Sequence, residues 1–410
     1  MSVRSLLCVL LVTCAPVSAQ DSSVFRQVLT SSRLSQNTSE WQADSRRVTP
    51  DCRIPWSVSK QTLHGGRQEG VEIVVINSGT LEIVVCPTRG MGILSVRRGD
   101  VQLKWDSPVA EVVHPKFVDL GSRGGLGWLE GFNEFLCRCG LESNGHPGVD
   151  KFVNNVGDEA EMELTLHGKI ANIPASEVVV EVDTTAPYAI HLSGTVFERF
   201  MFGPRLQLRT RLTVVPGETS FQLSDTVTNV GAADQEFQLI YHSNFGGPLL
   251  EEGSRVIAPA SAIKPFNDRA AEGMDTWHTY QGPTTGFVEQ VYLLTPLGDR
   301  KGQSVAVLHN KAMDKAASIR WSLNELPYLT IWKNTGAVAD GFVTGIEPGT
   351  NYPANRSVER EAGRVPVLKP GQTRSFTLTF GVHAGREEVE AAARQAASLA
   401  ISADGAPAGN

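Results

Sequence analysis

A histidine and a glutamate, far apart in the chain, each stand where a β-type run opens into a loop. His242 ends the run in LIYHSNFGG, and Glu347 lies between an isoleucine and a proline in TGIEPGTNYPAN. Histidine titrates near neutral pH and can give or take a proton. Apolar neighbours raise the pKa of a carboxyl group, which then exchanges protons near neutrality as well. The pair predicts general acid–base chemistry. The alternatives are a structural histidine bonded to a backbone carbonyl and an exposed loop carboxylate.

A third segment, residues 123–148, mixes glycine, aromatic and carboxylate residues without a strand or helix period. Its aromatic side chains, Trp128 among them, offer flat faces on which a sugar ring can stack, and Arg123 and Glu134 can bind hydroxyl groups. A few polar groups among apolar ones are typical of a ligand site. The alternative is a structural loop.

Four further residues are candidate ligand contacts. Arg89 follows a β-type run in CPTRGMGI, Asn244 lies two residues after His242, and Glu289 interrupts the apolar run FVEQVYLL. Trp332 stands at the end of the run LPYLTIWKN, where it suits either stacking or the core.

Several function classes have no support in the sequence. The net charge is −7 with no run of basic residues, which argues against nucleic acid as a partner. The glycines of residues 121–131 lack the βαβ context of a dinucleotide site. No Gly-x-Ser-x-Gly elbow or Walker loop occurs. Cys137 and Cys139 do not have the Cys-x-x-Cys spacing of a zinc or redox motif, so we expect no metal.

The elements that must position these residues are strands. Alternating apolar and polar runs recur from residue 70 to about residue 383, beginning with VEIVVI and LEIVVC around Asn77-Ser78-Gly79. This pattern predicts an all-β fold built as one large antiparallel sandwich. Residues 386–400, with acidic side chains in the first turn, predict a C-terminal helix. Residues 20 to about 47 are expected to be helical or loosely ordered.

The N-terminus predicts export. Arg4 precedes an apolar run with the length of a signal-peptide core, and small residues precede a cleavage site near Ala19. The run is too short for a stable membrane anchor. We therefore expect a periplasmic or secreted protein without stable membrane insertion, with lipidation at Cys14 left open. The four remaining cysteines can pair in three ways, but buried apolar thiols are the better prediction.

Together these motifs resemble the aldose-1-epimerase (galactose mutarotase-like) superfamily, in an epimerase-like branch. The resemblance rests on His242-Ser243-Asn244-Phe245, on Glu347-Pro348-Gly349-Thr350, on PYLTIW and on the RGMGI and CGLESNG stretches. It covers about residues 60–385. It implies a β-supersandwich, with His242 as general acid and Glu347 as general base. A second, upstream histidine of the family has no assigned counterpart, with Cys139-Gly140 and His146 in its region.

The implied organisation has four parts: a signal peptide over 1–19, an N-terminal segment with a helix and linker over 20–59, a carbohydrate-active β-supersandwich over 60–385, and a C-terminal helix and tail over 386–410. The implied reaction is interconversion of sugar anomers on a small carbohydrate or oligosaccharide, without a metal or cofactor. Two alternatives stay open, a lyase or isomerase acting on oxidised sugars or polysaccharide fragments and a non-catalytic glycan-binding protein. The oligomeric state is not predicted.

Overall fold

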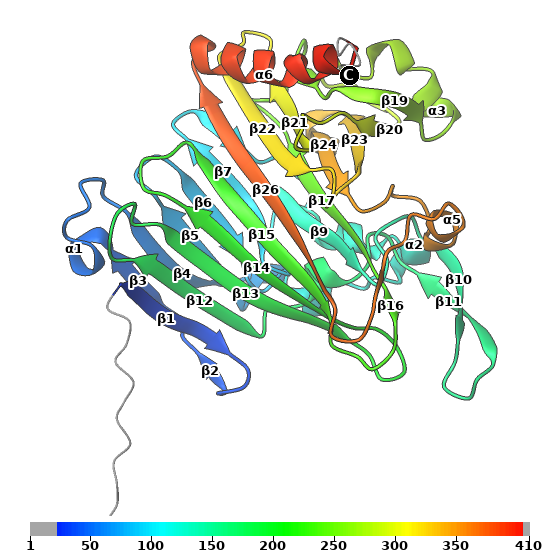
Figure 1. The fold of residues 1–410 in the computed structure, drawn as a ribbon, viewed down its shortest axis with the longest axis horizontal. Coiled ribbons are helices and arrows are strands. Elements are labelled where there is room, and N and C mark those ends of the chain that lie inside the picture. The colour runs from blue at the N-terminus through cyan, green and yellow to red at the C-terminus, as the bar shows by residue number, and fades with distance from the viewer. Residues whose placement is uncertain (1–22, 405–410) are drawn as a thin grey trace, which may run out of the picture.

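The computed structural model describes residues 23–404 (Figure 1). The predicted signal peptide, with Cys14 inside it, lies outside the described residues. None of the helices in the described range combines the length and apolar character needed to cross a bilayer.

One of the two large layers is a 12-stranded antiparallel sheet. Its strands are, in spatial order, β19 (Ala260–Pro265), β20 (Gln290–Pro296), β23 (Tyr328–Thr335), β24 (Phe342–Gly349), β17 (Gln238–Phe245), β9 (Leu136–Leu141), β7 (Gly92–Arg98), β6 (Glu82–Cys86), β5 (Val71–Asn77), β4 (Ser57–Leu63) and β3 (Trp41–Asp44), with β8 (Val101–Leu103) paired to β7.

The other layer is a 10-stranded antiparallel sheet that lies across the first (Figure 1). Its strands are, in spatial order, β18 (Arg255–Ile257), β21 (Gln303–His309), β22 (Lys315–Ser322), β26 (Thr373–Ala384), β15 (Ser220–Asn229), β14 (Arg205–Val214), β13 (Ile190–Arg199), β12 (Glu177–Asp183), β1 (Val24–Ser31) and β2 (Gln36–Asn37). The predicted all-β antiparallel sandwich is confirmed.

Smaller elements decorate the sandwich. Two additional two-stranded sheets pair β10 (Gly148–Val153) with β11 (Glu159–Leu164), and β16 (Gln235–Glu236) with β25 (Val367–Leu368). The short helices are α1 (Ser45–Val48), α2 (Ser122–Gly125), α3 (Asp268–Ala271), α4 (Val338–Gly341) and α5 (Arg356–Glu361), with 3₁₀ turns η1 (Gly66–Gln68), η2 (Pro115–Phe117), η3 (Gly127–Gly131), η4 (Ile170–Asn172) and η5 (Met274–Thr276). The predicted C-terminal helix is α6 (Arg386–Asp404), whose Val389 and Ala396 pack on Val305 and Val307 of β21.

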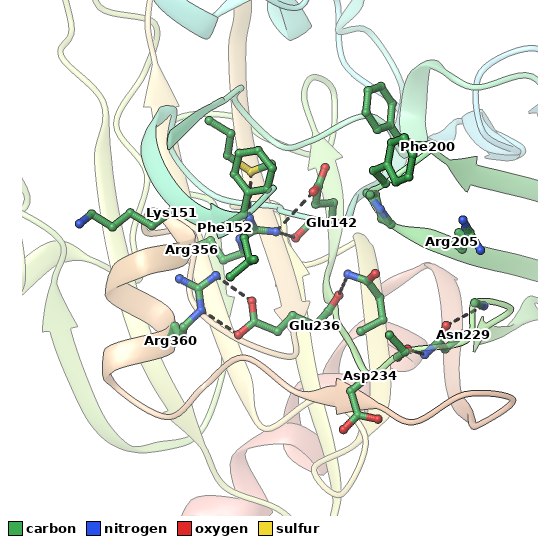
Figure 2. A pocket seen from close by; sticks show the side chains of 18 of the residues that line it. Glu142, Lys151, Phe152, Phe200, Arg205, Asn229, Asp234, Glu236, Arg356 and Arg360 are labelled. Carbon is green, nitrogen blue, oxygen red and sulfur yellow. Dashed lines mark hydrogen bonds and ion pairs between the residues drawn. The ribbon is translucent and has the colours of Figure 1, made fainter. Parts of the chain in front are cut away.

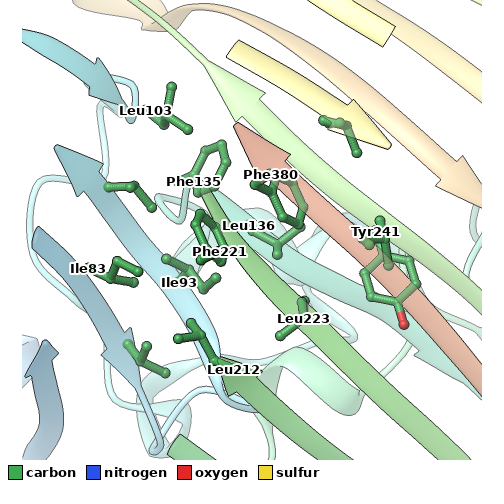
Figure 3. Close-up of a cluster of buried hydrophobic side chains, with 14 of the residues drawn as sticks. Ile83, Ile93, Leu103, Phe135, Leu136, Leu212, Phe221, Leu223, Tyr241 and Phe380 are labelled. Atoms are coloured by element: carbon green, nitrogen blue, oxygen red, sulfur yellow. The ribbon is translucent and has the colours of Figure 1, made fainter. Parts of the chain in front are cut away.

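The core fills the space between the two sheets, because alternate residues of each strand point inward. Phe135, just before β9, belongs to the 12-stranded layer, while Phe221 and Phe380 come from β15 and β26 of the other (Figure 3). The ring centroid of Phe380 lies 5.8 Å from that of Phe135 and 5.0 Å from that of Phe221. Burying one such side chain is worth about 1.5–3 kcal/mol. These rings therefore hold the layers together.

A buried charged residue also bridges the two layers. Arg138 of β9 forms an ion pair with Asp225 of β15 and donates to Thr210 Oγ1 of β14 at 2.6 Å. The hydroxyl of Tyr241 on β17 donates to the same aspartate at 3.0 Å. Arg138 and Tyr241 are directly opposite in the ladder, so both face the core. Their neighbours along the two strands, Cys137 and His242, must face the outer side of the sheet.

The N-terminal prediction was wrong. Residues 20 to about 47 were expected to be helical or loosely ordered, whereas most of them form β1, β2 and β3, with a single helical turn at α1. β1 pairs with β12 across seven positions, and β3 pairs with β4. The polar stretch between β1 and β3 connects strands at the edge of the sandwich and is not a linker. Pairing with neighbouring strands therefore outweighs the weak local sequence pattern of this segment.

Disulfide pairing and buried apolar thiols were the two possibilities for the cysteines, and the structure agrees with thiols. Cys86, Cys137 and Cys139 are buried thiols, and Cys52 is half-buried. None of these four residues forms a disulfide.

Candidate active site

His242 and Glu347 lie on neighbouring strands, β17 and β24, of the 12-stranded sheet. His242 Nε2 lies 3.3 Å from Glu347 Oε1, and both side chains are almost fully buried. The contact lacks the alignment of a hydrogen bond, so Oε1 has no hydrogen-bond partner. Residues 105 positions apart in the chain therefore meet because their strands pair.

A glycine on β24 makes room for the carboxyl group. A Cβ atom placed on Gly345 would lie 2.3 Å from Glu347 Oε1, far inside van der Waals contact. Gly345 and Glu347 point to the same face, because they are two residues apart on one strand. The absence of a side chain at Gly345 thus allows the glutamate to fold back over its own strand towards His242.

Asn244 fixes the proton on His242. The amide Nδ2 of Asn244 donates to two backbone carbonyls, those of Glu134 and His242, so its Oδ1 is left as an acceptor. This oxygen lies 2.7 Å from His242 Nδ1, which must therefore carry a proton and donate it. In the neutral ring, Nε2 then presents its lone pair to Glu347. A ligand-binding role was predicted for Asn244, and the structure places it against the histidine.

Burial shifts the pKa values of Glu347 and His242 in opposite directions. Loss of water raises the pKa of Glu347 well above its usual value, and the nearby Glu289 raises it further. Loss of water lowers the pKa of His242 well below its usual value, with His167 adding to the effect. Both shifts favour the uncharged forms. The uncharged forms place the proton on the Glu347 carboxyl and leave Nε2 of His242 with a lone pair, 3.3 Å from Oε1.

A second histidine, His167, belongs to the same cluster and was not among the predicted site residues. Its ring centroid lies 5.2 Å from that of His242 and 4.6 Å from that of Trp128. Nδ1 donates to the carbonyl of Asn144 at 2.9 Å, which leaves Nε2 as an acceptor. Packing of the ring away from water lowers its pKa to about 4, so His167 is neutral at neutral pH.

The loop that holds His167 is tied to the loop that follows Glu347. The side-chain amides of Asn144 and Asn351 are buried and bond to each other in both directions, at 2.9 and 2.8 Å. Since the carbonyl of Asn144 accepts from His167, this amide pair links the position of that ring to the end of β24.

Aromatic rings enclose His242 and Glu347. The ring centroid of His242 lies 5.3 Å from that of Phe132, 5.5 Å from that of Trp332 and 6.0 Å from that of Trp128. The indole Nε1 of Trp128 is buried and has no hydrogen-bond partner. An orphaned donor and the orphaned acceptor on Glu347 are groups that a hydroxylated ligand can satisfy, because unpaired buried polar atoms are costly.

The rim of the cluster is polar. Trp332, half-buried, donates from Nε1 to the exposed Glu289 at 2.8 Å. Glu289 lies just before β20 and not within it. His146, which was considered as the second histidine of the family, instead stacks on Phe266 with a centroid distance of 5.1 Å.

Three predicted ligand contacts lie apart from the pair. Arg89 and Glu134 form a fully buried ion pair, 2.6 Å between Nε and Oε1, behind the loop that carries Phe132. Arg89 also donates to the carbonyl of Val113. Arg123 is exposed. Within the described residues, no group of three His, Cys, Asp or Glu side chains is arranged to hold a metal ion.

Comparison with known proteins gives the family. The family described as "Domain of unknown function (DUF4432)" matches residues 68–382. The chain belongs to this family. No protein with a curated function matches it. A solved structure of a "putative aldose 1-epimerase" from Klebsiella pneumoniae subsp. pneumoniae is 44% identical, with a TM-score of 0.86, and the match covers 92% of this chain and 96% of that one.

More distant solved structures share the fold alone. A galactose mutarotase-like protein from Clostridium acetobutylicum is 14% identical, with a TM-score of 0.52, over 85% of this chain and all of that one. A protein from Escherichia coli K12, described like the Klebsiella one, is 16% identical, with a TM-score of 0.52, over 77% of this chain and all of that one. The predicted resemblance to galactose mutarotase-like proteins is confirmed, and this DUF4432 chain has their fold.

Proposed function

We propose that this DUF4432 protein is an aldose 1-epimerase-type isomerase that interconverts the anomers of a sugar. The observation that carries the proposal is the 3.3 Å contact between His242 Nε2 and Glu347 Oε1 inside an aromatic enclosure. The anomeric oxygen and the ring oxygen of an aldose are bonded to the same carbon. Two proton-exchanging atoms this close together can therefore reach both oxygens of one ring.

In the proposed reaction, sugar binding first moves the proton of the Glu347 carboxyl to Nε2 of His242. Glu347 then takes the proton of the anomeric hydroxyl while His242 gives its Nε2 proton to the ring oxygen. The bond between the anomeric carbon and the ring oxygen breaks, the aldehyde rotates, and reclosure with the two roles exchanged gives the other anomer. A hydroxyl that donates to Oε1 favours the ionised carboxylate, which prepares Glu347 to act as the base. Each positioned group is worth about 10²–10⁴ in rate.

The surrounding residues have supporting roles in this proposal. Asn244 keeps the proton on Nδ1 of His242, so that Nε2 is the nitrogen that exchanges. His167, neutral and with its Nε2 free to accept, can bind a sugar hydroxyl. Trp332, which is half-buried, offers a face on which the ring can stack, whereas the fully buried Trp128 packs against His167.

The charges near Glu347 favour a neutral sugar. Among the described residues, Glu289 is the charged side chain that shifts the Glu347 pKa, and no arginine or lysine does so. A lyase acting on an oxidised sugar needs a cation for the substrate carboxylate. The charged side chain that acts on Glu347 is instead Glu289, whose like charge would repel a substrate carboxylate, and this supports the anomer reaction over elimination. We further propose that the protein acts after export, as the N-terminal leader predicts.

The experiment compares His242→Ala, Glu347→Gln and the double variant by polarimetry. Since the two residues act as a unit, each single variant should lose about 10²–10⁴ in rate, and the double variant should lose little more. Circular dichroism checks that each variant is folded. Near-wild-type rates in either folded single variant overturn the assignment. Ultraviolet absorbance from an unsaturated product would indicate a lyase instead, and sugar binding without any turnover a glycan-binding protein.

A further inference from the structure

The enclosure around His242 and Glu347 is closed to solvent in this structure. The two residues are 4% and 2% exposed, and Oε1 of the carboxyl group is buried. The cleft of about 1000 Å³ between the β10–β11 hairpin and the turn that joins β13 to β14 gives no route to them, because no residue of the cluster lines it (Figure 2). A sugar ring can therefore reach Glu347 Oε1 only after part of the enclosure has moved.

The four rings around His242 differ in how they are held. Trp128 and Phe132 are buried within the cluster. His167 is half-buried, but a hydrogen bond from its Nδ1 to a backbone carbonyl fixes the ring. Trp332 is half-buried as well, and its ring centroid lies 5.5 Å from that of His242. Trp332 is thus the ring of the enclosure that reaches solvent and has no bond to the backbone of the core.

Trp332 stands next to the Glu347 carboxyl group on the sheet. Trp332 of β23 is directly opposite Gly345 of β24, and residues directly opposite in an antiparallel pair lie on the same face. The Glu347 carboxyl group folds back over that same glycine. Movement of the indole away from β24 is therefore the change that would open the enclosure beside Oε1.

One hydrogen bond at the rim holds this indole. Nε1 of Trp332 donates to Glu289 at 2.8 Å. Glu289 is exposed, and it follows a loop in which residues 283–286 are exposed too. Within residues 23–404, its carboxyl group forms no other hydrogen bond and no ion pair. A single hydrogen bond shifts an equilibrium by about two- to tenfold, so loss of this one would change how often the indole moves.

We propose that Trp332 is a gate to the acid–base site and that Glu289 is the positioning residue that holds the gate closed. In the open form, Nε1 leaves Glu289, the indole moves away from β24, and a sugar ring enters beside it. The proposal rests on the function proposed above and adds the route by which the sugar enters. Because a sugar binds only the open form, its apparent affinity is reduced by the fraction of molecules that are open.

Glu289 also acts on Glu347 directly, since its charge raises the pKa of that carboxyl group. The two effects can be separated by experiment. The gate depends on the indole N–H of Trp332 and is lost with it. The effect of the charge does not need the indole.

The test labels the full chain with diethyl pyrocarbonate, without sugar, and locates the modified histidines by mass spectrometry. In the wild type, His242 should react much more slowly than the exposed His64. Glu289→Ala and Trp332→Phe should each speed the labelling of His242 by about two- to tenfold, because neither variant can form the hydrogen bond. Glu289→Gln keeps an acceptor oxygen and should stay closer to the wild type. Glu218→Ala, at an exposed glutamate between β14 and β15, is the matched control and should react like the wild type.

A double variant separates the gate from the charge. Adding Glu289→Ala to Trp332→Phe should bring no further increase in labelling, because a phenyl ring has no N–H for the carboxylate to hold. A further increase would overturn the proposal, since Glu289 would then act without the indole. Wild-type His242 that reacts as fast as His64 overturns it too, as does wild-type labelling of His242 in folded Glu289→Ala.

Kinetics give a second readout. In polarimetry, Glu289→Ala should lower KM by a larger factor than it changes kcat, because more of the protein is open before the sugar binds. An unchanged KM would contradict the gate. Labelling needs no turnover, so the predicted labelling pattern in a protein without anomer exchange would support the gate and overturn the proposed reaction.

Discussion

Burial acts in opposite directions on the two central side chains, His242 and Glu347. It raises the pKa of the Glu347 carboxyl and lowers that of the His242 ring, so that both side chains are uncharged when no ligand is bound. Asn244 sets which nitrogen of the histidine takes part. The proposed chemistry therefore depends on three side chains from two adjacent strands.

Replacing Asn244 with alanine should lower the rate of anomer exchange by up to about tenfold, because the lost hydrogen bond to His242 Nδ1 is worth about 0.5–1.5 kcal/mol. The ring can then turn or change tautomer. Polarimetric rates measured against pH test this. A purely structural role for Asn244 would lower the melting temperature and leave the pH profile unchanged.

Glu347→Gln should stabilise the fold while it removes activity. A raised pKa in the folded state means that folding favours the protonated carboxyl, so this group's contribution is present at low pH and is lost as pH rises through the folded-state value. Because glutamine does not ionise, the variant does not lose stability in this way as pH rises. Melting temperatures from pH 5 to pH 9 should show a gap in favour of the variant that widens with pH. A gap that is constant with pH would contradict the raised pKa.

At the scale of elements, strand β24 provides the shape that the site needs. Gly345→Ala should displace the Glu347 carboxyl, since the new Cβ would lie 2.3 Å from Oε1, and reduce activity by about tenfold or more with a small effect on folding. Gly336→Ala is a matched control, because its Cβ meets nothing nearer than 3.7 Å. Polarimetry and melting curves on both variants provide the measurement. Equal activity in the two variants would contradict this account of Gly345.

The sequence predicted the strands of the core better than those of the N-terminal edge. Regular alternation identified runs such as those of β5 and β6, whereas β1 to β3 are short, polar and stabilised by pairing with β12 and β4. His167 was missed as a site residue because it lies outside any family motif. It nevertheless follows an alternating run and precedes a glycine, the same signal that selected His242. Which strands would pair, and so how close His242 and Glu347 would lie, requires the fold.

At the scale of the whole molecule, the sandwich unites distant segments, and the buried Arg138–Asp225 ion pair links its two layers. Removing one partner leaves a buried charge uncompensated. Arg138→Met should therefore cost about 3–5 kcal/mol of unfolding free energy, and adding Asp225→Leu should recover part of it. Urea unfolding of both single variants and the double variant forms the cycle. Purely additive effects would contradict direct coupling between the layers.

The most direct test of the central claim is NMR saturation transfer between the two anomers of free aldoses, with and without the wild-type protein. A protein whose His242 and Glu347 exchange protons with one sugar ring should accelerate the transfer for at least one neutral aldose, with no metal or nucleotide added. The acceleration should vanish in Glu347→Gln. A folded wild type that binds an aldose but leaves its anomer exchange at the buffer rate would contradict the claim.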